Sequence, residues 1–170
     1  MRRRTLLKLG LASGAALTLL AGIALLLHEP AWRDGRLTDT GRRVLDAVAR
    51  GVLDGWLPGD RGARRVALAS HLDRMSETLR AMPPASQREL AMLLGLLASA
   101  PGRLGLAGLP VDWPDADTEQ IQAALQGMRT SRVDLRQQAY HALRDLTHAA
   151  YFSDRATWAR LGYPGPTTVE

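Results

Sequence analysis

The chain has 170 residues and no cysteine, which excludes disulfides, thiolate metal sites and cysteine nucleophiles. Its length allows one domain. The formal net charge is +5, but Arg2, Arg3, Arg4 and Lys8 carry most of the excess. From His28 onward, 18 arginines face 17 acidic residues. Because a nucleic-acid-binding protein needs a concentrated basic surface, this balance predicts that the chain does not bind nucleic acid.

Residues 1–32 have the pattern of an export signal. The basic start MRRRTLLK precedes an apolar stretch that carries no charge from residue 9 to residue 27. The hexapeptide that begins at Arg3 is similar to the twin-arginine export motif, which a receptor on the translocation machinery recognises. The matching residues are Arg3, Arg4, Leu6, Leu7 and Lys8, with Leu6 where the motif usually has Phe. An ordinary signal anchor with additional arginines is the alternative.

The sequence also bears on whether this signal is removed. Signal peptidases prefer small residues at the −3 and −1 positions, and the residues after Leu27 offer no such triplet. An apolar stretch of about 19 residues is just long enough to span a bilayer core. We therefore expect an uncleaved anchor, in which Gly10–Leu27 crosses the inner membrane and the rest of the chain is periplasmic.

Residues 33–166 are predicted to form a helical domain. Apolar residues at helical spacing predict helices over 41–57, 62–82 and 86–99. The predicted buried stripe of the second helix includes Val66 and Ala69. The third helix begins with Ser86-Gln87-Arg88-Glu89, a predicted capping box. Because apolar residues cover most of its circumference, we expect this third helix at the centre of the bundle.

The second half of the domain follows the same pattern. Residues 100–117 are rich in Gly and Pro and predict a long structureless connection, which in a small domain tends to be functional or covered by a partner. Helices are predicted over 118–129, 131–152 and 154–161, and the buried stripe of the second of these starts at Leu135. No segment alternates like a strand. The prediction is an all-α fold: an irregular bundle of about five helices behind an N-terminal signal or anchor helix, with a tail at 167–170.

Two histidines and a carboxylate are the candidate metal ligands. His141, Asp145 and His148 are four and three residues apart, so they share one face of the predicted helix over 131–152. They span two helical turns, however, and a metal site usually draws a ligand from another helix, so we favour the alternative that they are the ordinary polar stripe of this helix. His71 stands alone, and we expect it on the surface. No catalytic residues and no cofactor-binding motif are predicted.

The C-terminal aromatic residues are the candidate partner-binding site. The chain has eight aromatic residues, and half of them fall within thirteen positions, followed by two prolines and a glycine. Tyr and Trp are enriched in binding hot spots, and a stiff tail loses little entropy on docking. We expect these aromatics beyond the last long helix, with a tail too short to fold back; packing at the end of the bundle is the alternative. The candidates are Tyr151, Phe152, Trp158, Tyr163, Pro164, Gly165 and Pro166.

The same region resembles a known family. The run RQQAYHALRDLT at 136–147, AYFSD at 150–154, TW at 157–158 and LGYPGP at 161–166 are similar to the C-terminal signature of the gluconate 2-dehydrogenase subunit 3, or gamma subunit, family. The leader and the LPGD turn at 57–60 are also similar to it. The likeness is good over 136–166 and loose over 41–166.

This resemblance implies a noncatalytic role. In that family the small subunit holds no flavin or haem and binds a GMC-type FAD-dependent catalytic subunit. Its twin-arginine leader is thought to carry that folded flavoprotein through the export pore. The expectation is therefore a periplasmic, membrane-associated subunit that has no cofactor and is not itself an enzyme. The alternative is a free-standing periplasmic helical protein, for which His141, Asp145 and His148 are the candidate metal ligands.

Overall fold

The structure is a computed structural model and describes residues 30–165. The twin-arginine motif, the stretch Gly10–Leu27, Pro166 and the tail at 167–170 lie outside these residues, so the predictions made for them stay predictions. Within 30–165, no single helix has the length and hydropathy to cross a membrane; one pair of helices, bent by 89° between residues 84–98 and 100–107, passes that test together.

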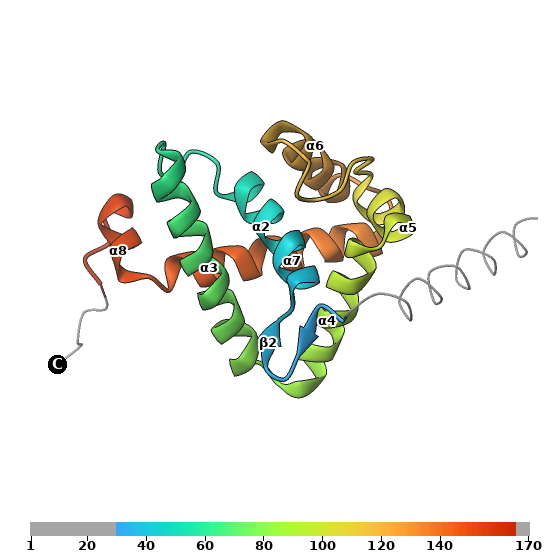
Figure 1. The fold of residues 1–170 in the computed structure, drawn as a ribbon, viewed down its shortest axis with the longest axis horizontal. Coiled ribbons are helices and arrows are strands. Elements are labelled where there is room, and N and C mark those ends of the chain that lie inside the picture. The colour runs from blue at the N-terminus through green and yellow to red at the C-terminus, as the bar shows by residue number, and fades with distance from the viewer. Residues whose placement is uncertain (1–29, 166–170) are drawn as a thin grey trace, which may run out of the picture.

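The described chain is mostly helical, which confirms the all-α fold class (Figure 1). Short helical turns connect or follow the longer helices, and one small hairpin precedes them. The long helices are α2 (Asp39–Val52), α3 (Arg61–Ala81), α4 (Pro84–Ala98), α6 (Thr118–Arg129) and α7 (Asp134–Phe152). The short elements are β1 (Trp32–Arg33), β2 (Arg36–Leu37), α5 (Ala100–Gly102), η1 (Arg103–Ala107), α8 (Arg155–Trp158) and η2 (Ala159–Leu161).

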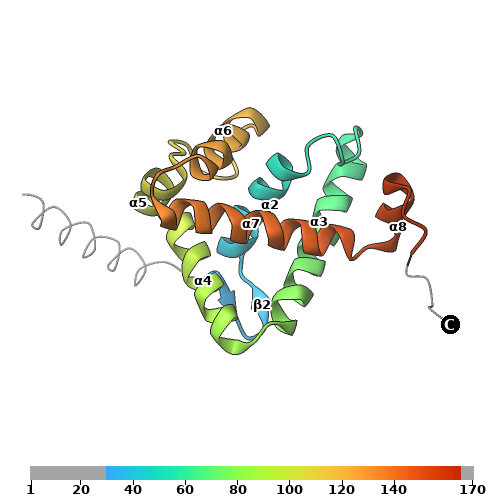
Figure 2. The same ribbon diagram turned by 180° about the vertical axis from the view of Figure 1, so that it is seen from behind.

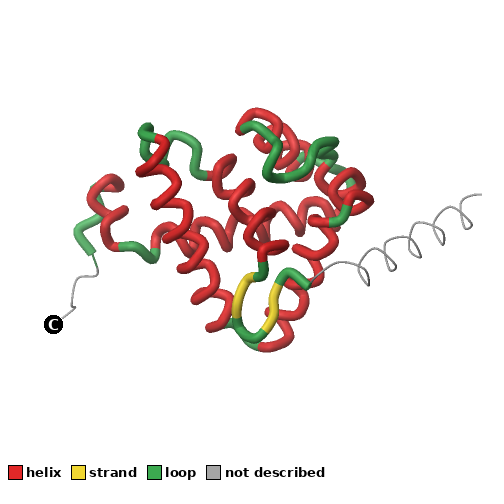
Figure 3. Tube along the Cα trace, in the orientation of Figure 1, coloured by secondary structure: helices red, strands yellow, loops and turns green. Residues whose placement is uncertain are grey.

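The hairpin β1–β2 is a difference from the sequence prediction, which had no strand. Its antiparallel strands pair Trp32 with Leu37, and the turn uses positive φ angles at Asp34 and Gly35 (Figure 3). This matches the Asp-Gly preference of tight hairpin turns. Two-residue strands are too short to show alternation, so periodicity could not reveal them. The Trp32 indole N–H donates to the Gln87 side chain at 3.2 Å, which fixes the hairpin beside α4.

The centre of the bundle is α2, not the helix predicted at 86–99. Helix α2 packs against α3, α4, α6 and α7, and more than half of its residues are buried. Helix α4 instead leaves Met92 60% exposed. It also begins at Pro84, two residues before the predicted capping box, with no side-chain cap. Proline suits the first turn because its φ angle is already helical and its missing N–H costs nothing there.

Two predicted stripes are partly wrong. Val66 and Ala69 of α3 are exposed, as is Leu135 of α7. All three lie in the N-terminal half of a helix whose C-terminal half packs on the core. Periodicity finds the apolar side of a helix but cannot tell how far along its length a neighbour covers it. The residues that α3 buries are Leu68, His71, Leu72, Met75, Ser76 and Leu79.

The predicted structureless connection at 100–117 is ordered. Its first part forms α5 and η1, and its second part buries Leu109 and Trp113, each 1% exposed. The Trp113 indole N–H donates to the Leu97 carbonyl at 2.8 Å, and the Arg50 guanidinium donates to the carbonyls of Trp113 and Ala116. A segment rich in Gly and Pro is therefore fixed by one buried tryptophan and one arginine.

The buried side chains form two clusters. The larger cluster lies among α2, α3, α4, α6 and α7 (Figure 2). The smaller one lies where α2, α3 and the end of α7 meet, near α8, and contains Ala49, Leu53, Leu57, Leu68 and Tyr151. This second cluster bears directly on the candidate site, because it includes one of the predicted partner-binding residues.

Candidate functional site

Tyr151 is a core residue. Only 8% of it is exposed, and its hydroxyl donates to the Trp56 carbonyl at 3.2 Å. Its ring meets those of Trp56 and His71 edge to face, with centroids 6.4 and 6.2 Å apart. The expectation that Tyr151 lies beyond the last long helix is therefore wrong: it is inside α7 and closes the second cluster.

The remaining C-terminal aromatics lie nearer the surface. Phe152 and Trp158 are half-buried and Tyr163 is 48% exposed. The Trp158 indole N–H donates to the Phe152 carbonyl at 2.7 Å, and the Trp158 and Tyr163 rings meet edge to face with centroids 5.3 Å apart. This pair presents aromatic surface at the end of the molecule. Its role in partner binding stays a prediction.

The tail folds back after Tyr163, contrary to the prediction that it is too stiff to do so. Gly162 takes a positive φ of 66°, and the Tyr163 N–H then donates to the Trp158 carbonyl at 3.0 Å. A Cβ placed on Gly165 would lie 3.5 Å from the Trp158 ring, so the backbone itself covers that ring. Glycines in the left-handed region make this reversal possible. Pro164 is exposed beside it.

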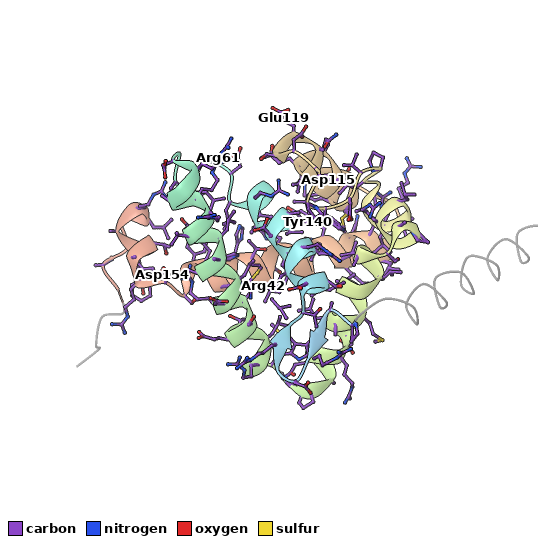
Figure 4. The ribbon with its side chains drawn as sticks, in the orientation of Figure 1. Arg42, Arg61, Asp115, Glu119, Tyr140 and Asp154 are labelled. Atoms are coloured by element: carbon purple, nitrogen blue, oxygen red, sulfur yellow. The ribbon has the colours of Figure 1, made fainter. Side chains whose placement is uncertain are left out.

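Ion pairs and arginines fix α8 to the bundle. Arg74 of α3 pairs with Asp154 at 3.2 Å and also donates to the Ala150 carbonyl (Figure 4). Arg160 donates to the Trp56 carbonyl and lies over the Trp56 ring. Between these contacts is a groove of about 530 Å³. Both arginines are already occupied by carbonyls, so the groove offers no free cation for an anionic ligand.

The metal candidates do not converge. Asp145 pairs with the neighbouring Arg144 at 3.1 Å and lines a groove between α4 and α7. His148 packs against Phe152 and lines a different groove, and its pKa is lowered by burial and by Arg144, with Asp145 opposing. His141 is exposed beside Tyr140. Among residues 30–165, no three His, Asp or Glu side chains are grouped to hold a metal ion.

His71 is buried, and the expectation of a surface histidine is wrong. It is 1% exposed, and neither ring nitrogen has a hydrogen-bond partner among the described residues. Burial, with a smaller contribution from Arg74, lowers its pKa from 6.5 to about 4. The imidazole is therefore neutral at pH 7. No sequence signal distinguishes this histidine from an exposed one.

One groove of the described surface was not predicted from the sequence. A groove of about 680 Å³ lies between α4 and α7, the two helices that diverge in Figure 2. Its lining is mainly apolar, and its only charged residues are Glu89 and Asp145. The full lining is Met82, Ser86, Glu89, Leu90, Leu93, Leu135, Gln138, Ala139, Ala142, Asp145, Leu146 and Ala149. The sequence of each helix alone carries no signal for this groove, because the groove forms only where α4 and α7 diverge in the folded chain.

A basic groove of about 360 Å³ lies between α2 and α3, and two of its arginines, Arg42 and Arg61, are labelled in Figure 4. Its charged lining is Arg42, Asp46, Arg61, Arg64 and Arg65. The described surface therefore separates its charges between grooves, although the total is nearly balanced. Comparison with protein-family models, with curated proteins and with solved structures found no significant match.

Proposed function

We propose that the chain is the noncatalytic small subunit of a periplasmic, membrane-associated FAD-dependent dehydrogenase of the GMC type. It carries the twin-arginine signal and escorts the folded catalytic subunit through the export machinery. The flavin and the chemistry belong to that partner.

The observation that carries this proposal is the motif Arg3-Arg4-Thr5-Leu6-Leu7-Lys8 before an uncharged apolar stretch. A receptor that reads the arginine pair passes folded proteins, so a partner bound to this chain before export can travel with it. The likeness of residues 136–166 to the gluconate 2-dehydrogenase subunit 3 family supports the identity of that partner. An ordered helical body with exposed aromatic and apolar surface is consistent with a binding subunit.

The metal-binding alternative has no observation in its favour. His141 is exposed, and Asp145 and His148 line different grooves. We therefore retain the escort function alone.

The test is export of the pair. Arg3 and Arg4 are replaced together by Lys, and the chain is co-expressed with a GMC-type oxidoreductase from the same genome that has no leader of its own. Because the receptor distinguishes arginine from lysine, both proteins should be retained in the cytoplasm. Cell fractionation with immunoblotting and periplasmic dehydrogenase activity are the measurements.

The matched control replaces a second pair of arginines, which lies outside the leader. These residues are Arg42 and Arg43, and both are changed to Lys. This variant should reach the periplasm with its partner. Normal export of the leader variant would contradict the twin-arginine signal. Retention of this chain while the flavoprotein still reaches the periplasm would contradict the escort role.

A further inference from the structure

The groove of about 680 Å³ between α4 and α7 is open to solvent in the described part of the chain. Leu90, Leu93 and Leu146 contribute to its apolar lining. Leu135 at its edge is 53% exposed. An exposed apolar groove between two helices is the usual docking site for one apolar face of a third helix.

The charge of the groove narrows the choice of occupant. Glu89 of α4 and Asp145 of α7 are its only charged residues, and both are acidic. Glu89 has no ion pair within the described residues, while Asp145 has only the exposed Arg144 beside it. The chain has more basic than acidic residues, so a groove whose only charged residues are carboxylates is a local exception.

The neighbouring groove shows the opposite arrangement. Between α2 and α3, four arginines and one aspartate line a smaller opening. The two grooves therefore carry opposite net charge, and the acidic one has the larger apolar surface. Complementary charge across an interface mainly sets which partner is accepted and how fast it binds.

From this geometry we infer that the α4–α7 groove docks a helix of the catalytic subunit whose apolar face is flanked by lysine or arginine. The inference rests on the proposed function for the source of that helix. The apolar face packs on Leu90, Leu93 and Leu146. The flanking cations lie against Glu89 and Asp145, one on each wall.

The dimensions fit such a helix. The lining residues of α7 run from Leu135 to Ala149, which is about 21 Å along a helix axis. Those of α4 and its preceding turn run from Met82 to Leu93, about 16 Å on the same rise per residue. A partner helix of four to five turns would cover the groove from end to end.

The experiment uses model helices, so it does not depend on the flavoprotein. The full chain is placed in nanodiscs of zwitterionic lipid, with Ser86→Cys labelled by an environment-sensitive dye. The chain has no other cysteine, so the signal reports this groove alone. Two 18-residue amphipathic peptides with the same apolar face are compared, one flanked by lysines and the other by glutamates, and binding to empty nanodiscs is subtracted.

The lysine peptide should bind about tenfold more tightly at low salt, with the difference shrinking in 0.5 M salt. In the double variant Glu89→Gln and Asp145→Asn, the affinities of the two peptides should differ by less than about threefold. Both peptides should still bind, because their apolar face still contacts the groove. Leu135→Asn should weaken both peptides, because it removes apolar contact surface without adding charge; this residue is 53% exposed, so folding should tolerate the change. Ala156→Trp, at the groove beside α8, is the control that should leave binding unchanged.

Several outcomes would overturn the inference. Equal affinity of the two peptides, or tighter binding of the glutamate peptide, would mean that Glu89 and Asp145 do not select a basic partner. Binding only after removal of residues 1–29 means that the chain's own leader competes for the groove. A dimer of this chain that Leu135→Asn dissociates would mean that a second copy is the occupant. The peptide measurements are independent of the export test. The proposal for the groove and the proposed escort function can therefore fail separately.

Discussion

At the scale of single residues, His71 shows how far tertiary packing can change the chemistry of a side chain. Helix α3 places it between Leu68 and Leu72, and Tyr151 of α7 covers it edge to face. Buried polar atoms without a hydrogen bond cost stability. The imidazole is tolerated here because it stays neutral and its ring still packs.

The first prediction concerns pH. The pKa of His71 is about 4 in the folded chain and 6.5 as the ordinary value, so the unfolded chain binds more protons between these pH values. Stability is therefore full above pH 6.5 and falls as the pH drops toward 4, by about 3 kcal/mol from this group alone. His71→Leu should flatten that slope and leave stability at pH 7 unchanged or higher. Urea unfolding at several pH values measures it.

The control is His141→Gln, which changes an exposed histidine on α7. This variant should keep the wild-type dependence of stability on pH. If His71→Leu kept the full slope between pH 4 and 6.5, other groups would be responsible and the buried histidine would be irrelevant to it.

At the scale of elements, the sharp bend from α4 into α5 decides where the connection to α6 can run. Ser99 ends α4, accepts the Gly102 N–H through its side chain and donates to the Leu96 carbonyl. This turn directs the chain so that Trp113 can enter the core below Leu97. The bend depends on the close approach of Gly102 to α4.

The second prediction tests that approach with a matched pair of glycines. A Cβ on Gly102 would lie 1.9 Å from the Leu96 carbonyl oxygen, whereas one on Gly105 would meet nothing within 4 Å. Because a backbone carbonyl cannot move aside without opening the turn, Gly102→Ala should destabilise the chain by about 3 kcal/mol. Gly105→Ala should lie within about 1 kcal/mol of wild type. Equal effects in thermal or urea unfolding would contradict this account of the bend.

At the scale of the whole molecule, the C-terminal aromatics divide between two roles. Tyr151 joins α7 to α2 and α3 within the second cluster. Trp158 of α8 is half-buried, and the exposed Tyr163 of the tail packs against it edge to face. The first role concerns folding of the domain, while the second leaves surface for a partner.

The third prediction follows from this division. Tyr151→Ala should destabilise the folded chain by about 3–5 kcal/mol, because it removes a buried ring and a hydrogen bond. Tyr163→Ala should change stability by less than about 1 kcal/mol and weaken capture of the flavoprotein. Thermal unfolding of the full chain and a pull-down of the oxidoreductase are measured side by side. A binding loss that merely follows the folded fraction would mean that the tail only packs.

The sequence alone was sufficient for the long helices and for the all-α fold class, because their apolar spacing and their Pro, Gly and Asp boundaries are local signals; it missed α5 and η1. The predicted bounds 118–129 are those of α6. In the structure, Asp117 and Gln120 form the capping box at the start of this helix. The sequence also contains the twin-arginine motif, which lies outside the described residues and stays a prediction.

Only the tertiary structure decided which helix is central, why residues 100–117 are ordered and where the groove lies. A stripe shows which side of a helix is apolar, but the partner that covers it comes from distant parts of the chain. That is why Val66 and Leu135 are exposed although they continue a stripe, while His71 and Trp113 are buried. Burial is a property of the packed assembly, and the groove exists only because α4 and α7 diverge.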